Sequence, residues 1–502
     1  MKQVIVGGYY NALNIATTEY ASFAGSYNWG GYNGNLQIIT TPGTLRNLRV
    51  ELDDVPGTGT YTFSLWRAVG TAAGAITTLT CTVAADGTIA SDTAHDVAVA
   101  VGDAIALQCD PDSPDNARYA RWTIEFEGDN ANESLILSST TVYSFQTSWV
   151  ALGGYGHDTE VNCRRVCPTS GVIKNLYVQL NGSDPGTDPD AYKYTLRIAN
   201  AGNSYVLTDT TLTCTITADD RTGHDTVHEI TVAAGDWLTI EIEPLNSPTN
   251  APFTSFGLTF EADIDGESII WGGSTDNLSN TDTEYNDIAG YKILAWTATE
   301  AQRYQLAQSC TLKKLYMLLS GDPGGTDKYT FTVRLEGASP ASGLTVEIAG
   351  GSTTGNDTTH TIAVSDGNTV NMMVVPTDTP AVVDAYWGLV CYIVEGDYPI
   401  SSIVYIGVKP VVTRKIIVER ASAIIVGVLA SASKGRAAIA SAVAIGVVAS
   451  ATRVVAFARA SKVSVGVTVS VIKSWITQRL SRIRVLLVSK KSRVKLLLGH
   501  KS

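Results

Sequence analysis

Gly43-Thr-Leu-Arg-Asn-Leu-Arg-Val50 begins a pattern that occurs three times in the chain. It returns as Gly171-Val-Ile-Lys-Asn-Leu-Tyr-Val178 and, with Cys310 in place of the leading glycine, as Thr311-Leu-Lys-Lys-Leu-Tyr-Met317. The glycine turn and the alternating apolar residues after it predict a strand with one buried face. The 502 residues are therefore expected to hold three copies of one domain and a remainder.

Five more landmarks follow in the same order in each copy, and together they predict about eight strands per copy. They are a strand at Tyr61, Tyr194 or Tyr329, a strand at Leu79, Leu212 or Leu344, an Asp-Thr-x-His motif ending at His95, His228 or His360, a turn at Gly102, Gly235 or Gly367, and a strand with Trp122, Phe256 or Trp387. Each copy has about 130 residues, enough to close its own core.

The composition favours an all-β fold, because Thr, Val, Ile and Tyr are plentiful and long amphipathic helical windows are missing. We expect three tandem antiparallel β-sandwiches of a jelly-roll-like kind, followed by a β-repeat stalk. The expected limits are residues 1–138, 139–274 and 275–400 for the sandwiches and 401–502 for the basic tail. The short links predict that the sandwiches stack as a rod.

The Asp-Thr-x-His motif is interpreted as structural, although a histidine beside an aspartate can act in catalysis. No serine or cysteine nucleophile recurs at a matched position, so we predict neither catalytic residues nor an enzyme. Asp and Thr are expected to cap a turn through their side chains. The following Val-Ala-Val-Gly-Asp sequence, with Gly102, predicts a hairpin.

Aromatic residues among Gly, Asn and Thr open the first two copies. The candidates for contact with a glycan are Tyr27, Trp29, Tyr32, Trp149 and Tyr155. Exposed rings of this kind could stack on a sugar. The favoured interpretation is that these rings cover an edge of the sandwich, and glycan contact is the alternative.

Neither a metal nor a cofactor is predicted. Asp184, Asp188 and Asp190 could hold calcium in principle, but solvated turn aspartates are the favoured interpretation. The seven cysteines include no pair at zinc-like spacing with a Cys or His partner. The N-terminus has no apolar core of signal-peptide length, so we expect synthesis in a host cytoplasm without export.

The charge of the chain is divided between an acidic body and a basic tail. Residues 1–400 carry 18 Lys and Arg against 47 Asp and Glu, whereas residues 401–502 carry 18 Lys and Arg against one acid. Five serines of the tail, from Ser402 to Ser481, recur every 19 or 20 residues. A unit of this length cannot bury its own apolar face, so it must stack on its neighbours, on the preceding domain or on another subunit.

The tail is expected to form strands and not a membrane span, because its longest uncharged run, Ala437 to Thr452, is shorter than the ~20 residues that a helix needs. Nucleic-acid binding is disfavoured, since the basic residues punctuate apolar strands and suit edge protection. The predicted anchoring residues are Arg420, Lys434, Arg453, Arg459 and Lys473.

The repeated motifs resemble domains of structural proteins of tailed bacteriophages. The resemblance rests on the Gly-Thr-Leu-Arg-Asn-Leu strand, the Pro-Gly turn, the Tyr-Thr-Phe strand and the Asp-x-x-His motif. The tail unit Ala421-Ser-Ala-Ile-Ile-Val-Gly-Val-Leu-Ala-Ser-Ala432 is similar to repeats that end some of these proteins. The resemblance implies a virion part, either a fibre or a capsid decoration.

The leading hypothesis from the sequence is thus a non-enzymatic protein of a virion exterior, which assembles as a homotrimer and contacts other virion proteins through its tail. The alternative is an adhesin that binds a host cell-surface glycan through the aromatic loops. A glycan depolymerase would need a pair of carboxylates in a cleft, and the sequence nominates none.

Overall fold

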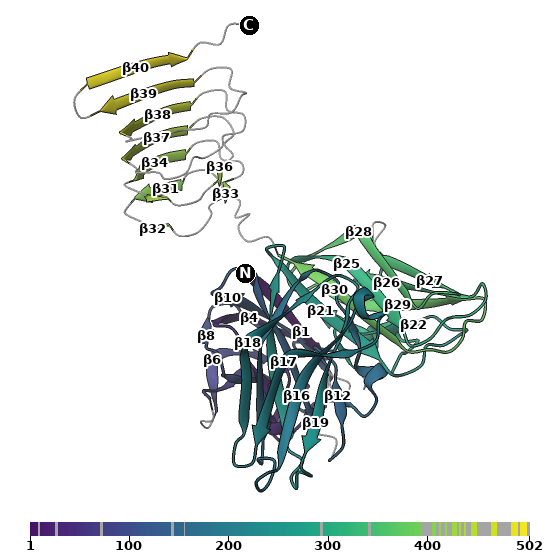
Figure 1. The fold of residues 1–502 in the computed structure, drawn as a ribbon. Helices are drawn as coiled ribbons and strands as arrows, with labels where there is room; N and C mark the ends of the chain where they lie inside the picture. The colour runs from purple at the N-terminus through teal and green to yellow at the C-terminus, as the bar shows by residue number, and fades with distance from the viewer. Residues whose placement is uncertain are drawn as a thin grey trace. The chain divides into compact units, whose positions relative to one another are not determined.

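The chain divides into two compact units, residues 1–393 and residues 394–502. The computed structural model describes residues 1–393 except 9–10, 26–28, 71–73, 142–144, 155, 292–294 and 340–342, and it describes the strand backbones of the second unit. The described residues are almost entirely β, with four short 3-10 helices, so the all-β prediction is confirmed. Figure 1 shows both units.

The first copy contains ten strands and one 3-10 helix. They are β1 (Lys2–Gly8), β2 (Glu19–Ala21), η1 (Tyr32–Gly34), β3 (Gln37–Ile38), β4 (Gly43–Leu52), β5 (Thr60–Ala68), β6 (Ala75–Val83), β7 (Ile89–Asp92), β8 (Val97–Val99), β9 (Ala104–Asp112) and β10 (Ala120–Gly128). Each predicted landmark strand lies in one of these elements.

The second and third copies repeat this series. The second comprises β11 (Glu133–Thr141), β12 (Ser148–Val150), β13 (Gly156–His157), η2 (Glu160–Cys163), β14 (Arg165–Val166), β15 (Gly171–Asn181), β16 (Ala191–Ala199), η3 (Ala201–Asn203), β17 (Thr208–Thr217), β18 (Thr222–Val232), β19 (Trp237–Leu245) and β20 (Phe253–Ala262). The third comprises β21 (Glu267–Ser274), β22 (Glu284–Asn286), β23 (Gly290–Tyr291), η4 (Glu300–Arg303), β24 (Gln305–Leu306), β25 (Cys310–Leu319), β26 (Lys328–Leu335), β27 (Thr345–Ala349), β28 (Thr354–Val364), β29 (Thr369–Thr377) and β30 (Ala385–Tyr392).

Each copy is a sandwich of two sheets, here called sheet I and sheet II. In the first copy, sheet I has the order β1-β10-β4-β7 and sheet II the order β2-β9-β5-β6, and the other copies repeat both orders. Numbered within a copy, the eight main strands run 1-8-3-6 and 2-7-4-5. The pairs 1-8, 2-7, 3-6 and 4-5 are those of one long hairpin wrapped around a core, which is the jelly-roll arrangement.

Strand pairing places the start of each copy earlier than the sequence pattern did. β11 pairs with β20 of the second copy, and β21 pairs with β30 of the third. The limit predicted at 138 lies inside β11, and the limit at 274 is the last residue of β21. By pairing, the second copy begins at Glu133 and the third at Glu267. The sequence pattern of a strand alone does not show whether the strand pairs with the copy before it or with the copy after it.

Two finer predictions are corrected by the register. The turn at Gly102 is not a hairpin, because β8 pairs with β4 in sheet I and β9 pairs with β5 in sheet II. The chain crosses between sheets there, and Gly102 has the positive φ of +86° that position i+2 of a type II turn requires. The residue equivalent to Tyr61 is Tyr192 and not Tyr194, since both Tyr61 and Tyr192 pair with a proline of the neighbouring strand.

Three hydrophobic cores lie between the sheets, one in each copy, and the first strands connect them. Ile5 of β1 belongs to the first core, whereas Val4 and Val6 of the same strand belong to the third. Leu135 and Leu137 of β11 reach back into the first core, and Trp271 of β21 reaches into the second. The first strands of all three copies therefore meet, and they line a cavity of about 40 Å³.

The three copies close into a ring. β3 of the first copy contacts β20, β11 and β15 of the second, and β14 of the second copy contacts the equivalent strands β30, β21 and β25 of the third. β24 of the third copy contacts β10, β1 and β4 of the first in the same way. A linear rod would keep the first and third copies apart, so the predicted rod is replaced by a closed arrangement with approximate threefold repetition.

The second unit consists of stacked parallel strands (Figure 1). The main sheet has the order β31-β34-β37-β38-β39-β40. Two further sheets have two strands each, β32 with β35 and β33 with β36. Their bounds are β31 (Val404–Gly407), β32 (Val411–Val412), β33 (Ile417–Val418), β34 (Ile424–Val428), β35 (Ser431–Ala432), β36 (Arg436–Ala437), β37 (Val443–Val448), β38 (Val463–Thr468), β39 (Ile483–Ser489) and β40 (Ser492–Leu498).

The register of this sheet follows the serine spacing. Gly407, Gly427, Gly446 and Gly466 lie opposite one another on successive strands. Each repeat therefore stacks on the next repeat, which is one of the three predicted ways to complete it. β40 ends the sheet by pairing antiparallel with β39.

Candidate functional site

The aspartate of the repeated Asp-Thr-x-His motif caps the backbone with its side chain, as predicted for the Asp. In the second and third copies the motif lies at a register shift inside β18 and β28. Asp357 Oδ1 accepts hydrogen bonds from the backbone N–H groups of Thr359 and His360, and Oδ2 accepts one from Thr345. The His360 ring contacts Asp357 Oδ2 at 2.9 Å and is about half exposed. Burial favours the neutral acid, but these hydrogen bonds outweigh it and lower the pKa of Asp357 to about 2. Asp92 and Asp225 have the same contacts in the other copies.

The aromatic residues that were predicted to contact a glycan differ in their exposure to solvent. Trp29 is 5% exposed and lies in the first core, with ring centroids 5.5 Å from Trp122 and 6.2 Å from Phe63. Trp149 is partly buried and packs against residues of the second and third copies. Tyr32 is 44% exposed. Tyr27 and Tyr155 lie outside the described residues.

Tyr32 belongs to an aromatic cluster on the outer face of sheet II of the first copy. Its ring stacks on Trp66 of β5, with centroids 5.6 Å apart and an interplanar angle of 27°. Tyr20 of β2 meets both rings edge-on, and its hydroxyl accepts a hydrogen bond from Gln108. Three separate elements thus hold the rings. We call Tyr20, Tyr32 and Trp66 the aromatic cluster.

The other two copies have an ion pair at the place of this stack. Register places Trp66 at the position of Arg197 in β16 and Arg334 in β26. Tyr32 begins η1, just as Glu160 begins η2 and Glu300 begins η4. Arg334 forms two parallel hydrogen bonds to Glu300, of 2.6 and 3.0 Å. An arginine fork on a carboxylate is a specific and strong contact.

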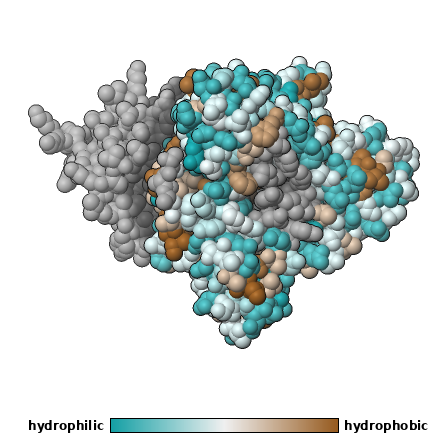
Figure 2. Space-filling model, turned by 90° about the horizontal axis from the view of Figure 1, so that it is seen from below, coloured by the Kyte–Doolittle hydropathy of each residue, from teal (hydrophilic) through white to brown (hydrophobic). Residues whose placement is uncertain are grey.

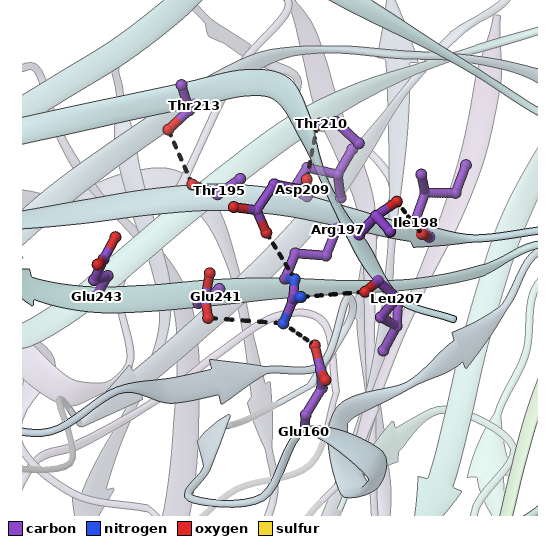
Figure 3. Close-up of polar contacts among 12 residues, drawn as sticks. Glu160, Thr195, Arg197, Ile198, Leu207, Asp209, Thr210, Thr213, Glu241 and Glu243 are labelled. Atoms are coloured by element: carbon purple, nitrogen blue, oxygen red, sulfur yellow. Dashed lines mark hydrogen bonds and ion pairs between the residues drawn. The ribbon is translucent and has the colours of Figure 1, made fainter. Parts of the chain in front are cut away.

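Arg197 lies at the centre of an acidic group in the second copy (Figure 3). It forms an ion pair with Glu160, its Nε lies 2.9 Å from Asp209, and its Nη1 lies 3.7 Å from Glu241. Its Nη2 also donates to the Leu207 carbonyl. Burial raises the pKa of Glu160 and Glu241, and Arg197 acts in the opposite direction. The arrangement ties η2 to three strands and is a structural network.

A pocket adjoins the aromatic cluster at the junction of the first and second copies. Its volume is about 360 Å³, and it is lined by Trp29, Gly30, Gly31, Tyr32, Asn33, Gly34, Asn35 and Phe253. Phe253 begins β20 of the second copy and is 39% exposed. Asn181 of the second copy donates to the Asn33 carbonyl at 3.0 Å and is itself buried. Both copies therefore shape this pocket.

Most other exposed apolar residues of the first unit are scattered. On the face shown in Figure 2, hydrophilic and intermediate residues cover most of the coloured surface, and hydrophobic residues form small separate patches. Single exposed apolar residues are ordinary on a protein surface. The pocket is distinguished by the convergence of several aromatic rings and not by a large apolar area.

The remaining predicted sites are placed as follows. Asp184 and Asp190 accept hydrogen bonds from the backbone of their own turn. Within the described part of the chain, no group of three His, Cys, Asp or Glu side chains is placed to hold a metal, and no helix there is long and apolar enough to cross a membrane. Arg420, Lys434, Arg453, Arg459 and Lys473 lie outside the described residues.

Comparison with known proteins adds no relative. A scan against protein-family models found no match, and a search of curated proteins found none.

Sequence reasoning nominated Tyr32 but missed Trp66 and Phe253, which complete the cluster and the pocket. Trp66 could have been found by aligning the copies, because it replaces an arginine at a repeated position. Phe253 could not, since its contact with Gly34 joins two copies across about 220 residues of sequence.

Proposed function

We propose that the chain is a non-enzymatic structural protein of a phage virion exterior, either a fibre component or a capsid decoration. The observation that carries this proposal is the closed ring of three jelly rolls made by one chain. A ring of this kind presents a nearly threefold body without three separate subunits. The features that recur in all three copies, namely the capped turns, bulged strands and junction contacts, serve structure.

The tail supports the same proposal through its charge and its repeat. Its 18 Lys and Arg against one acid suit a docking surface on an acidic protein, such as other virion proteins. Its parallel sheet has an outer strand, β31, at the end opposite to β40. An outer strand carries backbone groups that can pair with another chain. We propose that the tail anchors the protein or joins copies of it, as in a homotrimer.

Electron microscopy of intact particles tests the location. Gold-labelled antibodies raised against residues 1–393 are expected to bind the outside of particles of the phage that encodes the chain. Particles that remain unlabelled, and whose dissolved proteins lack the chain on an immunoblot, would contradict the proposal.

Light scattering tests the role of the tail. The full chain is expected to have the mass of an oligomer, and a chain that ends at residue 400 the mass of a monomer. A shortened chain that keeps the oligomeric mass, or a full chain that is monomeric, would contradict the proposal that the tail joins copies of the chain.

Binding of a host glycan is a second candidate function, and the exposed aromatic pocket at the junction of the first two copies favours it.

A further inference from the structure

Three equivalent positions can be compared at the three junctions, and at two of them the junction between the first and second copies differs from both others. It has Tyr32, Trp66 and Phe253, where the junction between the second and third copies has Glu160, Arg197 and Asp384. There the Tyr386 hydroxyl lies 3.3 Å from both Asn162 and Asp384. The third junction has Glu300, Arg334 and Tyr119. The Glu and the Arg of the other two junctions are thus replaced by Tyr32 and Trp66 at the first junction, and Phe253 adds a ring at a position where the third junction also has one.

This replacement leaves rings in contact with solvent. Two copies hold η2 and η4 in place with an ion pair, so the fold does not need exposed aromatic rings there. At the first junction Tyr32 is 44% exposed and Phe253 is 39% exposed. Large apolar side chains that remain partly exposed and face one pocket are typical of a binding site.

The lining of the pocket selects a class of ligand. None of its eight residues carries a charge, although the surrounding residues 1–400 have an excess of acids. An anion would find no cationic partner there and would be repelled by the body. Aromatic faces suit the C–H face of a sugar ring, and the Asn33 amide and the Tyr32 hydroxyl offer groups for its hydroxyls.

We propose that this pocket binds a neutral saccharide, with a sugar ring stacked against Tyr32 and Phe253. The volume of about 360 Å³ lies within the range of small-ligand pockets, about 300 to 1,000 Å³. The site needs both copies, since Tyr32 comes from the first and Phe253 from the second. The inference rests on the second candidate function, glycan binding, and names its ligand class, but it is independent of whether the chain is part of a virion.

An array of neutral and acidic oligosaccharides, probed with the full chain, tests the ligand class. Binding to neutral members is expected, and calorimetry with the strongest of them then gives its Kd. Tyr32→Ala and Phe253→Ala are each expected to weaken binding at least tenfold. Tyr119→Ala is the matched control, because Tyr119 stands at the position of Phe253 in the first copy, is 48% exposed, and lies outside the pocket.

Gly31→Trp provides a test that leaves the aromatic rings in place. Gly31 has φ −64°, and a Cβ added there meets no atom within 4 Å, so a larger side chain fits the backbone and projects into open space. It is expected to abolish binding without a change in Tm. A blank array, binding of acidic members alone, or binding that survives Gly31→Trp or falls equally in Tyr119→Ala would overturn the proposal.

Discussion

At the residue scale, charged side chains connect the strands where the copies meet. Glu267 begins β21, and its buried carboxylate contacts Lys314 Nζ at 2.7 Å and Lys313 Nζ at 3.0 Å. The equivalent Glu133 contacts Lys174 at 3.0 Å. The third equivalent is Lys2, and here the acid comes from β10, since Glu125 lies 3.2 Å from Lys2 and 2.8 Å from Arg46. The acid that neutralises the cations at this place thus comes from the first strand in two copies and from the last strand in the other.

Replacement of Glu267 by glutamine tests this contact. Burial alone would raise the pKa of Glu267, but hydrogen bonds from Lys314, Thr169 and Lys313 lower it, so the charged form is the stable one. Glu267→Gln is expected to reduce the free energy of unfolding by about 2 to 4 kcal/mol, because it leaves two lysines without their partner. Urea unfolding measures this change.

Glu347→Gln is the matched control for that experiment. Glu347 also pairs with a lysine, Lys328 at 2.8 Å, but the Glu347 side chain is 52% exposed and the Lys328 side chain 32%. Its loss is expected to change the free energy of unfolding by about 0 to 1 kcal/mol. Equal changes in the free energy of unfolding for the two substitutions would show that burial at the junction does not strengthen the ion pairs of Glu267.

The Asp-His pair predicts a dependence of stability on pH. The pKa of Asp357 is about 2 in the folded chain, below the value near 4 of an unfolded aspartate. The carboxylate therefore stabilises the fold fully above about pH 4, and this contribution is lost as the pH falls towards 2. Asp357→Asn is expected to cost about 2 kcal/mol at pH 7 and much less at pH 2.5, measured by urea unfolding. A cost that stays the same at both values would contradict this.

At the scale of elements, a bulge in the third main strand recurs in every copy. β4, β15 and β25 each shift register at one residue with positive φ, which is Asn47, Asn175 or Lys314. Asparagine adopts this left-handed conformation readily, and lysine does so less often. The ion pair between Lys314 and Glu267 explains why a lysine occupies the position in the third copy.

The short strands β3, β14 and β24 join the copies, and two of them approach glycines closely. A Cβ on Gly388 would lie 2.1 Å from the Val166 carbonyl oxygen of β14, and one on Gly257 would lie 2.1 Å from that of Ile38 in β3. The equivalent in the first copy is Thr123, whose hydroxyl accepts a hydrogen bond from Gln308. The junction between the third and first copies therefore leaves room for a side chain at this position. The other two junctions leave room only for glycine.

Gly388→Ala is expected to separate β14 from β30 and to reduce the free energy of unfolding by about 1 to 3 kcal/mol, as overpacking does. Hydrogen exchange should rise in β14 and β30. Gly31→Ala, where the added Cβ meets no atom, should change neither quantity. An unchanged stability of Gly388→Ala would show that the close contact at this junction does not hold.

The sequence predicted elements well where a pattern repeats within a strand. The all-β class, the landmark strands such as β4 and β25, the capping role of Asp357 and the stacking of the tail in 20-residue steps all follow from local periodicity. Local periodicity does not determine partners. It could not show that the turn at Gly102 crosses between sheets, or that β11 belongs to the copy after it.

The candidate site was predicted only in part, for a related reason. Composition identified aromatic residues near residue 30 but not their orientation, so Trp29, which is buried, and Tyr32, which is exposed, looked alike. Whether a ring faces the core or solvent depends on the strands that cover it. Phe253 joins the pocket only because the two copies pack together.

At the scale of the whole molecule, the first unit is described best as a closed body and not as a string of domains. Each first strand supplies residues to two cores, so no copy has a complete core of its own. Closure depends on contacts between the third and first copies, including Gln308 with the Asn47 carbonyl at 2.7 Å and Arg49 with Asp366 at 3.1 Å. How the copies divide into independently folding domains remains a prediction.

Small-angle X-ray scattering from residues 1–393 tests the closed ring most directly. A compact body of this length has a radius of gyration of about 21 Å, and a ring of three packed sandwiches should lie close to that value. Three sandwiches of about 130 residues in a line would exceed about 30 Å. A radius of gyration between about 21 and 24 Å is the predicted result, and a value near that of the line would contradict the closed ring.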